Sequence, residues 1–142
     1  MRKFLDIPVL KEVITDTHFS ARDRLGRTLV FMARILQDGS ARRIRDIAAD
    51  EGAGVLLEPG GMATVVGAGS AYFLQAAGKP ETCKANTPLT FRGVTVRSLR
   101  ADERFNVLQW SSSEGASYTL SVESGVIHST LPGGAVYTKA TK

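Results

Sequence analysis

Residues 16–27 of the chain read DTHFSARDRLGR and lie between two segments of different periodicity. The segment before them, residues 7–14, is an apolar run of the kind that forms a buried strand. The segment after them, residues 21–37, is predicted to be a helix that begins at the N-cap Ser20, because apolar residues recur there at helical spacing. These residues are Leu25, Leu29, Met32 and Leu36, with Phe31 and Ile35 beside them as further core positions. The order predicts a motif at the carboxyl end of a strand, where open α/β sheets bind ligands.

The motif brings a carboxylate, a histidine and three arginines to one strand-to-helix junction. Asp16 and His18 share a face if the strand continues through them. Arg22 and Arg24 fall in the predicted first helical turn, where the helix dipole disfavours a cation by about 0.3–1 kcal/mol. Arg27 follows Arg24 by three residues and so lies on the same helix face. This unfavourable placement of cations predicts a functional site that holds an anion.

The remainder of the chain, after residue 45, is predicted to be rich in β-structure. Short β-type runs alternate with turn residues, and their alternation favours antiparallel strands. The glycine clusters at 59–61 and 67–69 neither open a helix nor carry the Lys-Ser/Thr of a phosphate-binding loop, so we expect hairpin turns. The predicted strands cover residues 47–49, 55–57, 63–66, 71–74, 89–91, 94–99, 105–110, 118–122 and 126–128.

Composition narrows the classes of protein. The chain has 142 residues and a formal net charge of +4, and residues 22–45 alone carry seven arginines against two aspartates. Because almost no aromatic residues accompany these arginines, nucleic-acid binding is not expected. No run is long enough to span a membrane, and residues 1–6 lack the apolar core of a signal peptide, so the sequence indicates no compartment. The single Cys83 and the spacing of the histidines predict no metal site and no cofactor.

The motif at residues 16–27 resembles the histidine motif of the cyanophycinase-like serine peptidases, peptidase family S51. The likeness continues at residues 47–51, IAADE, which are similar to the family's strand ending in Asp-Glu, and at residues 125–130, GVIHST. The resemblance implies the C-terminal half of a three-layer, mostly parallel α/β sheet of the class I glutamine amidotransferase and flavodoxin type, with a β-rich C-terminal region. Residues 7–14 would be a central parallel strand. Residues 1–130 would form one domain, and residues 131–142 a frayed tail.

The resemblance also implies roles for particular residues. His18 would be the general base and Glu51 the acid that orients it, because the ends of neighbouring parallel strands lie together; Asp50 would then face the other way. A packed histidine at a helix start and a solvated turn carboxylate are the alternative interpretations of these two residues. The substrate pocket would be lined by Asp16, Thr17, Arg22, Arg24 and Arg27.

The sequence contains no Gly-x-Ser-x-Gly nucleophile elbow, and Ser70 lies in a turn between two β runs. We therefore expect a fragment, one half of a split protein or a remnant, with either a missing N-terminal half or a second copy as its partner. Thr17 stands where the family has glutamine, which favours aspartyl peptides, or peptides of arginine and aspartate, over cyanophycin itself. The two hypotheses are a serine peptidase that uses His18, and a non-catalytic module that binds anions or peptides.

Overall fold

The computed structural model describes residues 6–76 and 78–139. Two 3₁₀ turns, η1 (Pro8–Leu10) and η2 (Pro132–Gly134), lie near the two ends of the described chain, and α1 (Leu25–Gln37) is the α-helix. The strands are β1 (Val13–Thr17), β2 (Arg45–Ala49), β3 (Ala53–Leu57), β4 (Met62–Gly67), β5 (Ala71–Ala76), β6 (Phe91–Leu99), β7 (Arg104–Asn106), β8 (Ala116–Glu123) and β9 (Val126–Ser129).

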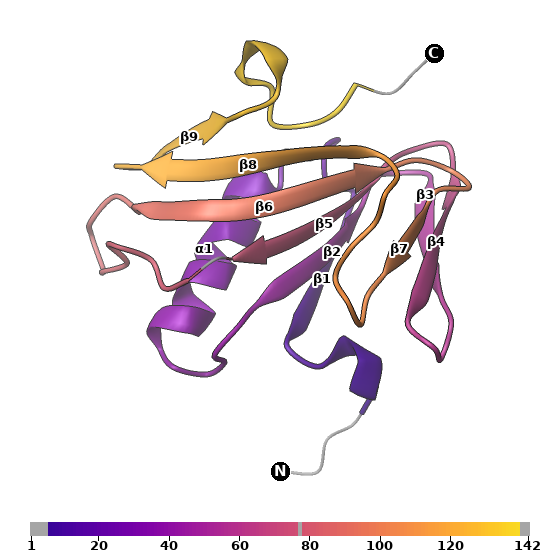
Figure 1. The fold of residues 1–142 in the computed structure, drawn as a ribbon. Helices are drawn as coiled ribbons and strands as arrows, with labels where there is room; N and C mark the ends of the chain where they lie inside the picture. The colour runs from indigo at the N-terminus through magenta and orange to yellow at the C-terminus, as the bar shows by residue number, and fades with distance from the viewer. Residues whose placement is uncertain (1–5, 77, 140–142) are drawn as a thin grey trace.

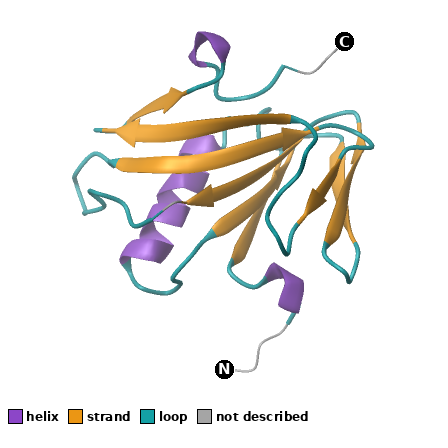
Figure 2. Cartoon of the chain, viewed as in Figure 1, coloured by secondary structure: helices purple, strands orange, loops and turns teal. Residues whose placement is uncertain are grey.

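The strands form two sheets. The larger sheet has the order β1-β2-β5-β6-β8-β9, and the smaller has the order β3-β4-β7. Helix α1 covers one face of the larger sheet, and residues of the smaller sheet pack against its other face (Figures 1 and 2). In the larger sheet only β1 and β2 pair in parallel, while all other pairs are antiparallel.

The predicted three-layer, mostly parallel α/β sheet is therefore wrong. The described chain is a mostly β protein with one helix and two largely antiparallel sheets. Connectivity gives the reason, since a parallel pair needs a crossover of a dozen or more residues. The segment containing α1 provides such a crossover, from β1 to β2, and hairpins or loops without helix make the later connections. Strand β1 consequently lies at the edge of the larger sheet, not at its centre.

The first strand also differs in its bounds from the predicted residues 7–14. Pro8 opens the 3₁₀ turn η1, because proline fixes its own φ and is well accommodated at the start of a helical turn. Glu12 then adopts a left-handed conformation with φ of 58°. Both features interrupt an extended chain, so β1 begins only at Val13.

Helix α1 begins at Leu25, four residues later than predicted, and Ser20 does not cap it. The Leu25 amide instead donates a 3.1 Å hydrogen bond to the Tyr137 hydroxyl, which in turn donates to Asp23 at 2.8 Å. A group from the end of the chain thus satisfies an amide that a local cap was expected to satisfy. Gly39 follows the helix with φ of 72°, a left-handed conformation that glycine adopts readily and that commonly ends helices.

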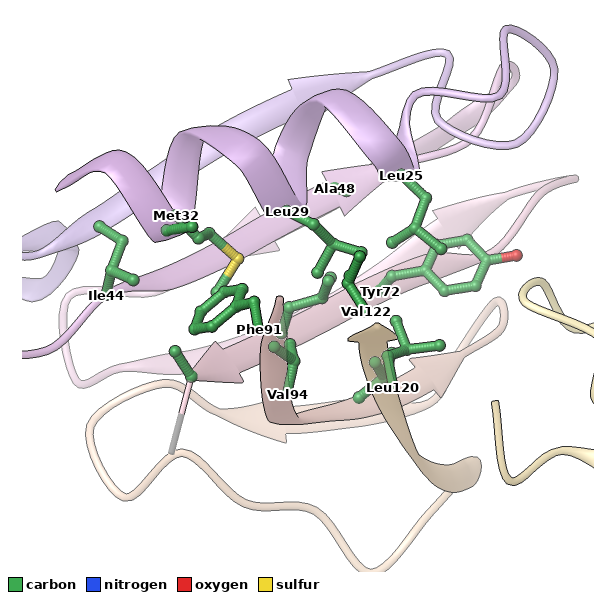
Figure 3. Packing of buried hydrophobic residues seen from close by; sticks show 14 of the residues in the cluster. Leu25, Leu29, Met32, Ile44, Ala48, Tyr72, Phe91, Val94, Leu120 and Val122 are labelled. Atoms are coloured by element: carbon green, nitrogen blue, oxygen red, sulfur yellow. The ribbon is translucent and has the colours of Figure 1, made fainter. Parts of the chain in front are cut away.

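The apolar stripe of α1, formed by Leu25, Leu29, Met32 and Leu36, packs into the larger of two cores, between α1 and the larger sheet (Figure 3). Its four predicted positions are buried, whereas Phe31 is 52 % exposed and is not a core residue. The second core lies between the two sheets, where Phe73 and Phe105 stack with ring centroids 4.0 Å apart.

Most predicted strands are present, with shifted ends. The two glycine clusters form the β3–β4 and β4–β5 turns, as expected. At Gly67, whose φ is 94°, a Cβ atom would lie 2.0 Å from the carbonyl oxygen of Gly52, so only glycine fits there. The predicted runs at 89–91 and 94–99 are largely one strand, β6, with an irregularity between Phe91 and Val94. The predicted strand at 105–110 is a strand only as far as Asn106, where β7 ends.

The segment after residue 130 is packed as far as the structure describes it, in contrast to the expected frayed end. Tyr118 donates a 2.9 Å hydrogen bond to the Val136 carbonyl, and the Ser98 and Thr138 hydroxyls lie 2.6 Å apart. The Tyr137 ring meets Phe19 and Tyr72 edge-on. Among the described residues, no helix has the length and apolarity needed to cross a membrane.

Candidate functional site

The carboxyl ends of β1 and β2 meet at one edge of the larger sheet. Their parallel register pairs Thr17 with Ala49, so the residues that follow each strand leave the sheet side by side. His18 follows β1, and Glu51 lies in the turn after β2. The Nδ1 atom of His18 and an Oε atom of Glu51 are 3.8 Å apart. The pairing inferred from adjacent parallel strands is thus present in the structure.

The backbone of His18 turns sharply away from β1. Its φ of 52° is left-handed, so the strand ends at Thr17 and His18 does not extend it. The next amide, that of Phe19, donates a 3.1 Å hydrogen bond to the Ala49 carbonyl and holds the turn against β2. The Nδ1 atom has no exposed surface and no hydrogen-bond partner among the described residues, although the side chain is 39 % exposed. The exposed part of the ring is therefore the side that carries Nε2.

Asp50 anchors the turn that carries His18, a role that the sequence analysis did not assign. Its carboxylate accepts hydrogen bonds from the Ser20 amide at 2.9 Å and the Ser70 amide at 3.3 Å, and the Tyr72 hydroxyl lies 3.5 Å away. Asp50 thus connects the β1–α1 turn to the β4–β5 turn and to the core. The adjacent acidic pair Asp50 and Glu51 was the available signal: successive residues face opposite ways, so one holds the turn and the other faces His18.

Asp16 is the centre of a second polar group, on the helix side of β1. Its carboxylate accepts hydrogen bonds from Arg24 at 2.9 Å, from Arg27 at 2.7 Å to each oxygen, and from Thr28 at 3.2 Å. The side chain is only 10 % exposed. Burial opposes ionisation, yet hydrogen bonds from Arg27, Arg24 and the Thr17 amide hold the pKa of the Asp16 carboxyl below its ordinary value.

This cluster explains the arginines that seemed misplaced in the sequence. Arg24 precedes the helix, and Arg27 lies in its first turn, where Asp16 is the anion that compensates both. Arg22 lies before the helix in an exposed turn, and the part of the chain that the structure describes offers no partner to its guanidinium. Thr17 is exposed on β1.

The predicted single pocket is divided into two groups in the structure. His18 and Glu51 lie together at the strand ends, whereas Asp16 and Arg27 line a cavity between β1 and α1 to which neither of the former contributes. The reason is the parity of β1: Asp16 faces the helix, and the chain turns before His18 can occupy the same face.

Asp46 on β2 is a buried carboxyl that the sequence analysis missed. It has no exposed surface, and neither of its oxygens has a hydrogen-bond partner among the described residues. Burial raises the pKa of the Asp46 carboxyl to about 8, with a further contribution from ionised Asp16 and a smaller opposing effect of the Ile47 amide. The available signal was its position two residues from Ile44 and from Ala48, which places a carboxyl on the core-facing side of a strand.

Neither a metal centre nor a family assignment emerges from the described chain. Within residues 6–76 and 78–139, no three His, Cys, Asp or Glu side chains gather closely enough to hold a metal ion. No protein-family model matches the sequence, and no curated protein matches it significantly. The functional argument therefore depends on the motif and on the geometry of these side chains.

The Asp16 cluster predicts a measurable loss of stability in the Asp16→Asn variant. We expect the free energy of unfolding to fall by about 1–2 kcal/mol at neutral pH, because charge-assisted hydrogen bonds from two arginines are lost and solvent screens part of the effect. Since folding lowers the pKa of Asp16, this stabilisation is present above the ordinary value of 3.8 and is lost as the pH falls through the folded pKa. Denaturant titration at several pH values measures it. The control Asp38→Asn, which breaks the exposed pair with Arg34, should cost only about 0.3–0.5 kcal/mol; equal losses would contradict the prediction.

The buried Asp46 predicts the opposite dependence on pH. The folded chain keeps the proton up to about pH 8. The unfolded chain releases it near the ordinary value of 3.8. Asp46 therefore reduces the free energy of unfolding by at most about 1.4 kcal/mol for each pH unit between these values. The Asp46→Asn variant should be stabilised increasingly as the pH rises toward 8, whereas the exposed Asp102→Asn control should show no such trend. A gain that does not change with pH would show that the carboxyl of Asp46 is ionised in the folded chain.

Proposed function

We propose that this chain supplies the general base of a cyanophycinase-like serine peptidase. His18 is the base, Glu51 is the acid that orients it, and the substrates are aspartyl peptides or peptides of arginine and aspartate. The observation that carries the proposal is the 3.8 Å approach of His18 Nδ1 to the Glu51 carboxylate. These two residues are 33 positions apart in the sequence, and the parallel pairing of β1 and β2 brings them together.

The orientation of the imidazole suits a general base. Nδ1 faces Glu51 inside the turn, so the Nε2 side is free to take a proton from a nucleophile that approaches from solvent. The 3.8 Å separation is longer than the donor–acceptor distance of a hydrogen bond by less than about 1 Å. Glu51 is 69 % exposed and lies in a turn, so its side chain has room to close this gap when substrate binds, as catalytic hydrogen bonds commonly do.

The arginines of the motif divide into two roles in this proposal. Arg22 is the guanidinium available to a substrate carboxylate, which it would hold with charge-assisted hydrogen bonds. Arg24 and Arg27 act through Asp16 as positioning residues, because their contact with that carboxylate fixes the start of α1 relative to β1. Thr17 is exposed at the end of β1 and lacks the side-chain amide that a glutamine would bring to the rim of the site.

The nucleophilic serine comes from a second polypeptide in this proposal, because the 142 residues contain no nucleophile elbow. The partner that supplies the serine is a missing N-terminal half, because a second copy of the chain has the same 142 residues and the same lack of an elbow. Strand β1 has no neighbour on its outer side among the described residues, and an open strand edge is a template for pairing with another chain. Since His18 directly follows β1, a polypeptide paired along this edge would end close to the base.

A second candidate function is a non-catalytic module that binds anions or peptides. The absence of a nucleophile elbow and the exposure of Arg22 favour it. The two functions differ in the role of Glu51, which is required to orient a base and is dispensable for an anion site.

The first test concerns the tautomer of His18 in the chain alone. If Glu51 orients the ring, neutral His18 should carry its proton on Nδ1, and long-range ¹H–¹⁵N NMR spectra should show this tautomer. The Glu51→Gln variant should shift the population toward the Nε2–H form. His128, exposed on β9, is the internal reference and should not change. An unchanged His18 spectrum in Glu51→Gln would remove the support for a catalytic pair.

The second test uses the complex of this chain with its partner, which is identified as the polypeptide that a fluorophosphonate labels. It measures how fast the complex hydrolyses an aspartyl-arginine dipeptide. His18→Ala should lower kcat/KM by about 10²–10⁴-fold and suppress labelling, because the serine loses its base. Arg22→Ala should raise KM more than it lowers kcat. The His128→Ala control should retain full activity. Full turnover and labelling in His18→Ala would refute the peptidase, and peptide binding without any labelled complex would favour the binding module.

A further inference from the structure

A cavity of about 240 Å³ lies between the edge strand β1 and helix α1. Its exposed lining residues are Thr15, Arg27, Phe31 and Arg34, whereas Asp46 on β2 is fully buried. A ligand reaches the covered oxygens of Asp46 only after exposed lining side chains rotate, and rotations of exposed side chains occur within nanoseconds. Neither His18 nor Glu51 lines this cavity.

The carboxyl of Asp46 is a group in this cavity that can accept hydrogen bonds from a ligand. Asp46 faces the helix side of the sheet, as its neighbours Ile44 and Ala48 do. Both of its oxygens lack a partner among the described residues. Buried polar atoms are almost always paired in folded proteins, so the Asp46 carboxyl, once ionised, calls for donors that the described residues do not provide.

The other charged groups that line the cavity already have partners. Arg27 is bound by Asp16, and Arg34 is paired with Asp38 at 3.0 Å. Asp46 is therefore the lining carboxyl that, once ionised, has no counterion among the described residues. A ligand that pairs with Asp46 must donate hydrogen bonds and must also neutralise the charge of the ionised carboxylate. A cation with N–H groups does both.

The walls restrict the shape of the ligand. Ile14 and Ile35 contribute apolar surface, which suits a short hydrocarbon stem. One face of the Phe31 ring is covered by the Arg27 guanidinium, 5.9 Å from the ring centroid. A planar group that offers two parallel N–H donors matches a carboxylate better than a point charge does.

We propose that this cavity binds a guanidinium group on a short apolar stem, which pairs with both oxygens of Asp46. The group can belong to a free small molecule or to an arginine side chain of a second copy of the chain. In either case the guanidinium replaces the proton that Asp46 carries at neutral pH, so binding leaves the net charge of the cluster unchanged.

This exchange makes the affinity depend on pH. Since the pKa of Asp46 is about 8, affinity should rise with pH as the proton becomes easier to remove, and then level off above that value. From about pH 6 to about pH 8 the expected rise is about 50-fold. The other charged groups facing the cavity are Asp16 on β1 and Arg27 and Arg34 on α1; Asp16 is held ionised, and arginines do not titrate in this range.

Calorimetric titration with ethylguanidinium chloride near pH 8 tests the proposal. A dissociation constant of about 1 mM is expected for so small a ligand. N-ethylurea, which is planar and still offers a parallel pair of N–H donors but carries no charge, should bind at least about tenfold more weakly, because it leaves ionised Asp46 without a counterion. Asp46→Asn should abolish the binding of ethylguanidinium and its pH dependence, whereas Glu123→Gln, which removes an exposed carboxylate on β8, should leave both unchanged.

Light scattering distinguishes the two sources of the guanidinium. A monomeric chain that binds ethylguanidinium indicates a free ligand, and a dimer that ethylguanidinium or Asp46→Asn dissociates indicates an arginine of a second copy. The proposal is overturned if near pH 8 the wild-type chain neither binds the probe saturably nor loses a dimer to it. Equal affinity for N-ethylurea, or unchanged affinity in Asp46→Asn, would overturn it too. If the Asp46→Asn variant does not fold, the pH profile of the wild-type chain is the test. An affinity for ethylguanidinium that rises toward pH 8 supports the proposal, and an affinity that does not change with pH overturns it.

Discussion

The contact of Asp16 with Arg24, Arg27 and Thr28 is the constraint on which the arrangement of the site depends. Asp16 lies near the end of β1, and its partners lie at and just before the start of α1, so one carboxylate closes the turn between them. A buried carboxylate is tolerated only when it is paired and hydrogen-bonded. The strand end and the helix start must therefore stay in register, and His18 lies in the turn that this contact spans.

Asp50 fixes the same turn from the opposite side. It binds the Ser20 amide, while the Phe19 amide binds the Ala49 carbonyl, so the turn is held to the end of β2 by two hydrogen bonds. The imidazole of His18 is in this way carried by a backbone tied to both parallel strands. The side chain of Glu51, which is 69 % exposed, approaches it from a turn whose backbone is hydrogen-bonded to Ser70 and Ala68. In the proposed function, a base held by its backbone beside an exposed acid fits a site that completes itself when a partner or substrate arrives.

The sequence predicted what local periodicity and strand order determine. The helical stripe, the hairpins and the meeting of His18 with Glu51 follow from side-chain spacing and from the rule that neighbouring parallel strands end at one edge. Three features could not be read in this way. The mostly parallel sheet was implied by a resemblance, whereas the chain contains one helix and so makes one parallel pair. Arg24 and Arg27 looked unfavourable because only the helix dipole was considered. Their partner Asp16 lies eight and eleven residues earlier in the sequence, and helix-capping rules cover only residues close to the helix end. Left-handed Glu12 and His18 moved the strand ends.

Asp16 and Asp46 show how one face of a sheet assigns different charge states to two carboxyls. Ile14 pairs with Asp46 and Asp16 pairs with Ala48, so the two acids are near neighbours beneath α1. The helix start gives Asp16 two guanidinium groups and a hydroxyl, which keep its pKa low, and gives Asp46 none. Once Asp16 is ionised, its charge adds to burial in raising the pKa of Asp46. The charge state of the first carboxyl is therefore fixed by the fold, while that of the second is left to a proton or to a ligand that brings its own positive charge.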